Sequence, residues 1–381
     1  MRKLFLFCSI SILFLNISII EFIVDKTYFG VFANIVYLSV LIVIFQINYD
    51  SREKIYWMYI FNMFLGILFH LILSNKPAYI FQDSIRWILL VAVLLVSNKY
   101  RSSDVFFYLL ISFFILNSTV AILEFISKTN YIKYEYTNEF SEYYLENEFR
   151  AFALTNHPLA SANVNIIIMS FILVNSRIKS SLKTLLILLG AISLFCFNSR
   201  AALIFFLSLF SVRYIFKGWG RFISITLAIL FVGILTDITI FFPSGGFKYL
   251  GRLSQLDYLN DGSFLTRISS FYSFISIDWS LESIFLGGNI IYIPGTNNAI
   301  ENGVLLTISW WGVIVGTLKF LLEILISYKM LINYDLNSRI IILTACWGVA
   351  FFNNNSFNTL PFAFLIFSFL SFKSIPSYFI R

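Results

Sequence analysis

The sequence predicts an all-α integral membrane protein of about twelve transmembrane helices, and three observations support this class. Hydrophobic residues make up 59% of the chain and charged residues only 12%, with a mean hydropathy of +0.83. A soluble domain carries about 25% charged residues, so this composition excludes an ordinary soluble fold. The apolar residues also fall into runs of membrane-spanning length, and the loops between these runs are basic on one side of the predicted membrane.

Each apolar run is expected to form one helix, because about 20 mostly apolar residues cross a bilayer. The expected helices cover 4–22, 29–47, 55–73, 82–97, 104–126, 158–175, 184–198, 201–216, 222–242, 301–326, 339–353 and 357–373. They divide the chain into about five N-terminal helices over 1–126, an external loop over 127–157, about four central helices over 158–242, a second external loop over 243–300 and about three C-terminal helices over 301–381.

The basic residues predict the orientation of these helices. Every short loop on one side carries Lys or Arg, as in 177–183 and 213–221, and the positive-inside rule assigns such loops to the cytoplasm. Both termini are then cytoplasmic, while the two long loops and the turn at 198–200 are external. Because the cytoplasmic loops are short, the functional groups are expected at the external face. The same basic loops explain the net charge of +7, so no nucleic-acid partner is expected.

Four arginines are candidates for binding an anionic substrate. Arg200 lies in a short turn between two apolar runs, where an arginine usually faces a partner or a water-filled cavity. Its planar guanidinium grips phosphate in a bidentate manner, although an interfacial arginine can also extend to water. Arg150 and His157 close the first external loop, and a lone histidine more often has a packing or hydrogen-bonding role. Arg252 and Arg267 add two cations in the second external loop.

Glu301 is the first candidate for a general base, because it stands where the second external loop enters an apolar run and is expected to be partly desolvated there. It equally fits a helix N-terminal carboxylate that complements the macrodipole. In the same loop, the pair 287–288 is Gly-Gly and allows a close backbone approach. Three further carboxylates of that loop compete for the role of base, namely Asp257, Asp261 and Glu282.

External arginines and carboxylates at a membrane surface suit a substrate whose lipid tail lies in the bilayer and whose phosphate lies at the surface. Mixed charges in a long loop do not make a selectivity ring, which argues against an ion channel. The three cysteines and two histidines show no metal-ligand spacing, so neither a metal nor a cofactor is expected.

Three stretches resemble the O-antigen ligase/polymerase family of bacterial envelope glycan enzymes. FRAFALTNHPLASAN is similar to the family's entry to a middle helix, and FNSRAALIFFLSLF is similar to its Ser-Arg turn, the most specific of the three. The third stretch begins at Arg267, continues through SFISIDWSLESIFLGGN and ends in ENGVLLTISWWGVIVG. The resemblance covers about residues 150–316, and the predicted topology of the whole chain agrees with it.

The resemblance implies a metal-independent, GT-C-like glycosyltransferase in the bacterial inner membrane, with its active site on the periplasmic face. Ligases of the family typically carry a His at the loop-to-helix junction, where this chain has Glu301 followed by Asn302. This difference favours a Wzy-type polymerase of undecaprenyl-diphosphate-linked oligosaccharide repeat units. By the same resemblance, a polysaccharide chain-length regulator is an expected partner.

The roles expected for such a polymerase fall into two groups. Glu301 would act as the base, and Arg200 and Arg267 would stabilise the diphosphate leaving group. The residues expected to bind diphosphate or glycan are Arg150, His157, Arg252 and Asn302.

Two other functions remain open. A ligase would transfer finished polymer to the lipid A-core, and a flippase would move the lipid-linked units across the membrane. A flippase is expected to show two similar halves and cations within its helices. The sequence shows no internal repeat, and its cations gather at the helix ends, so the helix interiors are interpreted as nearly free of charge.

Overall fold

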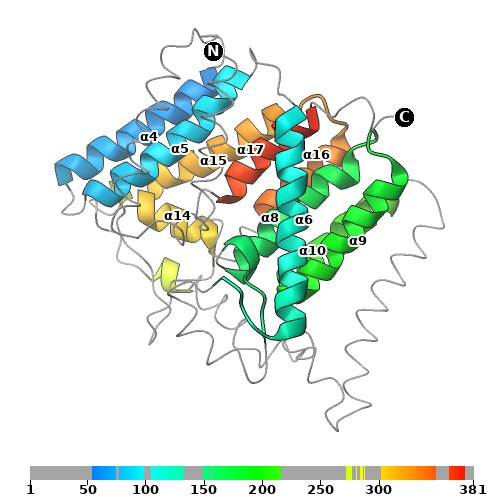
Figure 1. Ribbon diagram of the computed structural model, residues 1–381. Helices are drawn as coiled ribbons and strands as arrows, with labels where there is room; N and C mark the ends of the chain where they lie inside the picture. The colour runs from blue at the N-terminus through cyan, green and yellow to red at the C-terminus, as the bar shows by residue number, and fades with distance from the viewer. Residues whose placement is uncertain are drawn as a thin grey trace. The chain divides into compact units, whose positions relative to one another are not determined.

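The computed structural model describes residues 54–73, 77–97, 104–132, 149–155, 157–215, 272–276, 280, 284–285, 287, 302–348 and 360–373. Within these ranges the chain is mostly helical and contains no strand, which agrees with the predicted all-α class (Figure 1). The helices expected at 4–22, 29–47 and 222–242 lie outside the described residues.

One helix in the described part of the chain, α6 (Asp104–Ser127), is long and apolar enough by itself to cross a membrane. Shorter apolar helices cover Lys54–Phe69, Ser84–Leu94, Pro158–Val174, Ser180–Cys196 and Leu360–Phe372. These helices coincide with runs read from the sequence, whereas the total of about twelve spans stays a prediction.

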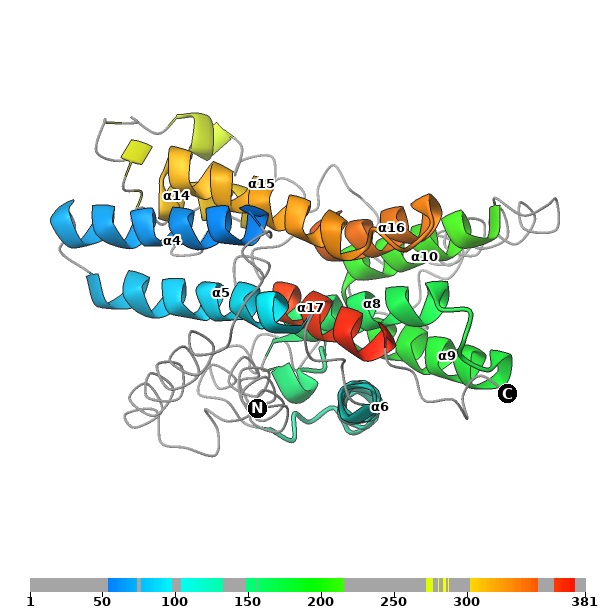
Figure 2. The same cartoon turned by 90° about the horizontal axis from the view of Figure 1, so that it is seen from above.

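The chain forms two compact units, and each draws on separate parts of the sequence. Unit 1 comprises 1–106, 266–333 and 350–374, and its described helices are α4 (Lys54–Leu73), α5 (Pro77–Ser97), α14 (Gly303–Trp311), α15 (Val313–Met330) and α17 (Leu360–Lys373). Helix α4 packs against both α5 and α15, and Figure 2 shows α4 and α5 running side by side. Helix α17 lies against α5, where the Trp87 and Phe362 rings are 5.7 Å apart.

A break at Gly312 divides the helix expected over 301–326 into α14 and α15, so the prediction of one continuous helix there was wrong. Gly312 has φ 82° and ψ 157°, a conformation that side chains rarely tolerate. A Cβ at Gly312 would lie 2.7 Å from the carbonyl oxygen of Phe285, because the backbone of Phe285 packs against the break. Gly287 reaches the same break with φ 60°, which confirms the close approach predicted for this glycine.

Unit 2 comprises 107–265, 334–349 and 375–381. Its described helices are α6, the 3₁₀ turn η1 (Ala153–Thr155), α8 (Pro158–Val174), α9 (Ser180–Cys196), α10 (Arg200–Ile215), α16 (Leu336–Leu343) and the π-helical turn η3 (Thr344–Gly348). Every residue of α8 except Leu159 is buried, and α8 packs against α9, α10 and α16. Helix α8 is therefore the core helix of this unit.

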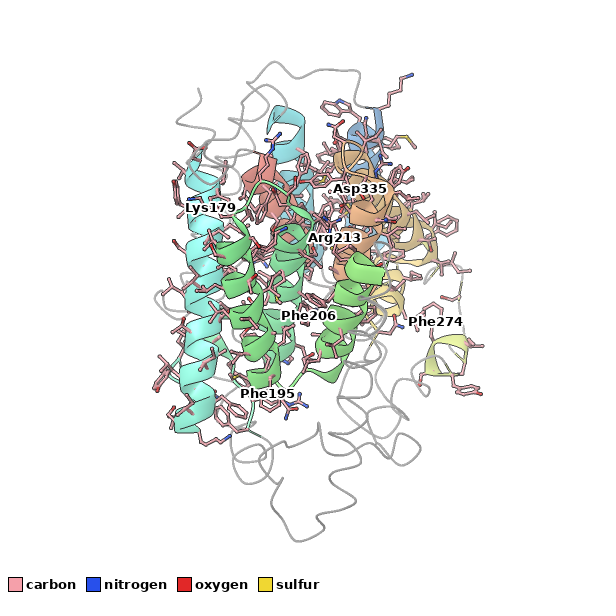
Figure 3. The ribbon with its side chains drawn as sticks, turned by 90° about the vertical axis from the view of Figure 1, so that its right-hand side faces the viewer. Lys179, Phe195, Phe206, Arg213, Phe274 and Asp335 are labelled. Carbon is pink, nitrogen blue, oxygen red and sulfur yellow. The ribbon has the colours of Figure 1, made fainter. Side chains whose placement is uncertain are left out.

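The described charges of unit 2 separate toward its two ends. In Figure 3, Lys179, Arg213 and Asp335 lie toward one end, and Phe195 lies toward the other. The end with Lys179 and Arg213 carries the loops predicted to be cytoplasmic. The end with Phe195 carries the segments predicted to be external, and the candidate site is built there.

Candidate functional site

A buried carboxylate holds the segment 149–155 against the end of α6. Glu124 Oε2 accepts hydrogen bonds from the backbone N–H groups of Phe152 and Ala153, at 2.8 and 2.9 Å. Its Oε1 accepts a third from the N–H of Tyr131 at 3.0 Å. Because Glu124 is fully buried, these donors replace the water that a carboxylate would otherwise bind. Glu124 thereby sets the position of the chain next to Arg150.

A buried hydrogen-bonded network of side-chain amides and hydroxyls also holds the segment 149–155. Asn117 Oδ1 accepts from the N–H of Leu154 at 3.0 Å, and Asn117 Nδ2 donates to Asn165 Oδ1 at 3.0 Å. Asn165 Nδ2 in turn donates to the hydroxyls of Ser193 and Ser118, at 2.8 and 3.0 Å. These residues come from α6, α8 and α9, so the network links three helices to the segment at this end of unit 2.

The segment also meets the turn that contains Arg200. The N–H of Ala151 donates to the carbonyl of Cys196, the last residue of α9, at 3.1 Å. The chain then turns and α10 begins at Arg200, with the Ser199 hydroxyl accepting from the N–H of Ala202 at 3.4 Å. The two stretches that the sequence singled out around Arg150 and Arg200 are therefore brought together by their backbones.

Strained backbone gathers at the same place. Three non-glycine residues in the described ranges have positive φ, namely Lys128 at 55°, Ala153 at 50° and Asn198 at 50°. One lies after α6, one in the segment 149–155 and one in the turn before α10. Such conformations cost on the order of 1 kcal/mol or more and persist where the surrounding contacts impose them, as they often do at functional sites.

Lys128 is a cation at this end that the sequence reasoning did not select. Its Nζ lies 3.7 Å from the ring centroid of Phe125 and 5.5 Å from that of Phe149. Phe125 also packs edge-on against Phe195 of α9, with centroids 5.7 Å apart. Burial lowers the pKa of Lys128, since the apolar rings replace part of its water. The aromatic group fixes the lysine beside the end of α9.

Arg150 and His157 lie on either side of residues 152–154, whose backbone N–H groups are held by Glu124 and Asn117. Arg150 is buried, and the His157 ring caps α8, where Nδ1 accepts from the N–H of Leu159 at 3.2 Å. This hydrogen bond assigns the proton of the neutral ring to Nε2, which can donate to a bound anion. The cap is also a structural role, of the kind expected for a lone histidine.

The surroundings of His157 favour its neutral form. Desolvation by the nearby protein and, to a smaller extent, the charge of Arg150 lower its pKa from 6.5 to about 4. The side chain is nevertheless exposed to solvent, which screens both effects. At neutral pH the imidazole is uncharged, and its unprotonated Nδ1 can accept the hydrogen bond that caps α8.

A pH dependence of stability follows from this pKa. Because the folded protein disfavours the charged ring, the contribution of His157 to stability is complete above about pH 6.5 and is lost as the pH falls toward about 4. Thermal unfolding of the purified protein in detergent between pH 4 and 8 measures this loss. His157→Asn keeps a capping oxygen that does not titrate, so the variant should show a flatter profile over that interval. An unchanged profile in the variant would assign the dependence to other groups.

Of the remaining candidates, one caps a helix and the others lie outside the described residues. Arg252, Arg267 and Glu301 lie outside the described residues, as do the competing carboxylates Asp257, Asp261 and Glu282. Asn302 is buried in unit 1, where its Oδ1 accepts from the N–H groups of Val304 and Leu305, at 3.1 and 3.0 Å, and caps α14. The side-chain oxygen of Asn302 is thus occupied by the hydrogen bonds that cap α14.

The charges at this end of unit 2 suit an anion. Arg150 and Lys128 supply positive charge, His157 supplies an N–H donor, and α10 adds the positive end of its dipole at Arg200. The oxygens of Glu124 are occupied by backbone donors. No family model, curated protein or solved structure matches the chain. The site itself is therefore the main guide to function.

Proposed function

We propose that this protein is a membrane glycosyltransferase that polymerises undecaprenyl-diphosphate-linked oligosaccharide repeat units into O-antigen or a similar surface polysaccharide. The observation that carries the proposal is the meeting of the Arg150 segment with the Arg200 turn at one end of unit 2, beside Lys128. This end is the one predicted to face the outside of the bacterial inner membrane. A lipid-linked diphosphate brings its charge to such a surface while its tail stays in the bilayer.

The proposed reaction transfers the growing chain to an incoming unit. A hydroxyl of the incoming sugar attacks the anomeric carbon of the growing chain, a new C–O bond forms, and the bond from that carbon to the diphosphate breaks. The electron pair leaves with the diphosphate, whose charge Arg200 and Arg267 stabilise, while Arg150 binds the lipid-linked substrate. Glu301 takes the proton of the attacking hydroxyl. Arg252 and Asn302 are proposed to bind substrate, and a chain-length regulator is the proposed partner.

A flippase is the alternative from another functional class, and the structure corrects one expectation that counted against it. The helix interiors were interpreted as nearly free of charge, yet Lys319 and Glu323 lie inside α15 with their side chains buried. They form an ion pair with each other, so they add no net charge for binding an anionic substrate. The described cations of the candidate site lie at helix ends, which continues to favour the transferase over the flippase.

The lipid carriers of a deletion strain test the proposal directly. Loss of a polymerase should leave undecaprenyl diphosphate bearing a single repeat unit on the periplasmic side, and the intact gene should restore long chains. Carriers with full-length polymer would identify a ligase instead. Single units that stay on the cytoplasmic side would identify a flippase. Either result would overturn the proposed polymerase.

A further inference from the structure

A second charged cluster lies in unit 1, apart from the residues of the proposed reaction. Lys319 Nζ and Glu323 Oε1 on α15 are 2.6 Å apart, and the Tyr59 hydroxyl on α4 donates to the same Glu323 oxygen at 2.7 Å. Lys319 Nζ also lies 3.4 Å from the ring centroid of Trp87 on α5. We call these four residues the α15 clamp.

The α15 clamp is enclosed by protein. Its four side chains are between 0% and 3% exposed, and they lie within helices that the sequence predicts to cross the membrane. Charges at such a depth are costly unless they are paired, and here each charge has a partner. A buried pair of this kind contributes little net stability compared with apolar residues of similar size. We therefore consider the pair for its role in specifying one arrangement of the helices, and not for its contribution to stability.

Two further contacts extend the clamp along α4. Asn62 Nδ2 donates to the carbonyl of Val315 at 3.1 Å, and a Cβ at Gly66 would lie 3.2 Å from Val315 Cγ1. Tyr59 thus meets Glu323 while Asn62 and Gly66 meet Val315, so α4 and α15 run in opposite directions. A shift of α15 by one turn, about 5.4 Å, would break both hydrogen bonds at once. Polar contacts select helix register in membranes, where lipid gives apolar contacts little advantage.

We propose that the α15 clamp is a positioning device that sets the register of α15 against α4 and so fixes the broken helix α14–α15. The Val315 end of α15 lies directly after the Gly312 break, and α14 begins at the Asn302 cap. The residue before that cap is Glu301, the base of the proposed reaction. The clamp acts on register whatever the activity is, and its effect on polymer synthesis rests on the proposed function.

Disulfide formation between Gly66→Cys and Val315→Cys measures the register directly, after Cys8, Cys196 and Cys346 are replaced by Ser. The parent protein should cross-link, since these positions face each other closely. Lys319→Met or Glu323→Leu alone leaves one buried charge without its partner, and either should lower protein abundance and cross-linking about tenfold or more.

Two double variants separate charge balance from register. Lys319→Met with Glu323→Leu removes both charges and the acceptor for Tyr59, so abundance should recover while cross-linking and long polysaccharide stay low. Lys319→Met with Glu323→Gln keeps an oxygen for the Tyr59 hydroxyl, so cross-linking and polysaccharide should both recover. Full recovery in the Leu variant would overturn the clamp as a register device. Normal cross-linking with lost polymer in the Gln variant would overturn the proposed effect of register on polymer synthesis, because the charges would then act in the chemistry.

The cross-linking result does not depend on the activity. If the deletion strain showed no polymerase defect, the proposed function would fail while the register readout would still decide the role of the clamp.

Discussion

Arg200→Ala should lower the yield of long polysaccharide by about 10²–10³-fold while the protein stays inserted and abundant. In the proposed reaction the diphosphate gains charge as it leaves, and a fixed cation stabilises that charge more in the transition state than in the bound substrate. Arg200 opens α10, where the helix dipole adds to its charge, and the turn before it begins after Cys196, whose carbonyl binds the segment that carries Arg150. Chain-length ladders from a complemented deletion strain measure the effect.

Three matched variants make this experiment specific. Arg150→Ala and Glu301→Ala should show the same loss, because both residues are assigned to the same transfer. Arg200→Lys should recover part of the activity, since lysine keeps the charge but lacks the planar fork of arginine. Arg177→Ala removes an exposed arginine from the predicted cytoplasmic loop between α8 and α9, so its ladder should be unchanged. Normal ladders from abundant Arg200→Ala protein would exclude Arg200 from the reaction.

The helices could be predicted from sequence because an apolar run reports directly on a buried or lipid-facing helix. The run 104–126 became α6 and the run 158–175 became α8, each with ends within a residue or two. The break at Gly312 could not be predicted in this way, because both flanking segments are equally apolar. It depends on the backbone of Phe285 lying against a glycine with positive φ, a contact between parts distant in sequence.

The site was predicted in part for a similar reason. Arg150 and Arg200 were selected from their position in the sequence, and the structure joins Ala151, next to Arg150, to Cys196, four residues before Arg200. Glu124 was missed although it lies within the apolar run 104–126, and the argument about buried charge that was made for Arg200 applies to it as well. Lys319 and Glu323, one helical turn apart, gave a comparable signal that was not used. What no local pattern shows is the set of groups that complete these contacts, namely the backbone donors to Glu124 and the Tyr59 and Trp87 side chains on other helices.

Glu124→Ala should disable the site without removing any group that touches substrate. The change leaves the buried N–H groups of Phe152 and Ala153 without their acceptor, at a cost of about 1–3 kcal/mol each, and also removes the acceptor of the partly buried Tyr131 N–H. Ala153 has φ 50°, a strained conformation that the carboxylate helps to impose, so the segment is expected to relax and to displace Arg150. Long polysaccharide should fall as far as in Arg150→Ala.

Glu124→Gln separates positioning from a general loss of folding. Its amide oxygen can still accept from Phe152 and Ala153, whereas its NH₂ group would face the N–H of Tyr131, so two of three contacts survive. The Gln variant should therefore recover much of the polymer that the Ala variant loses. Ser127→Ala, an exposed change one turn away on α6, serves as the control and should match the parent. Because a displaced Arg150 weakens substrate binding, the Ala variant should raise the KM for the lipid-linked unit and also lower the thermal stability, and the Gln variant should restore much of both. Equal polymer yields from parent and Glu124→Ala would show that the segment holds its position without this carboxylate.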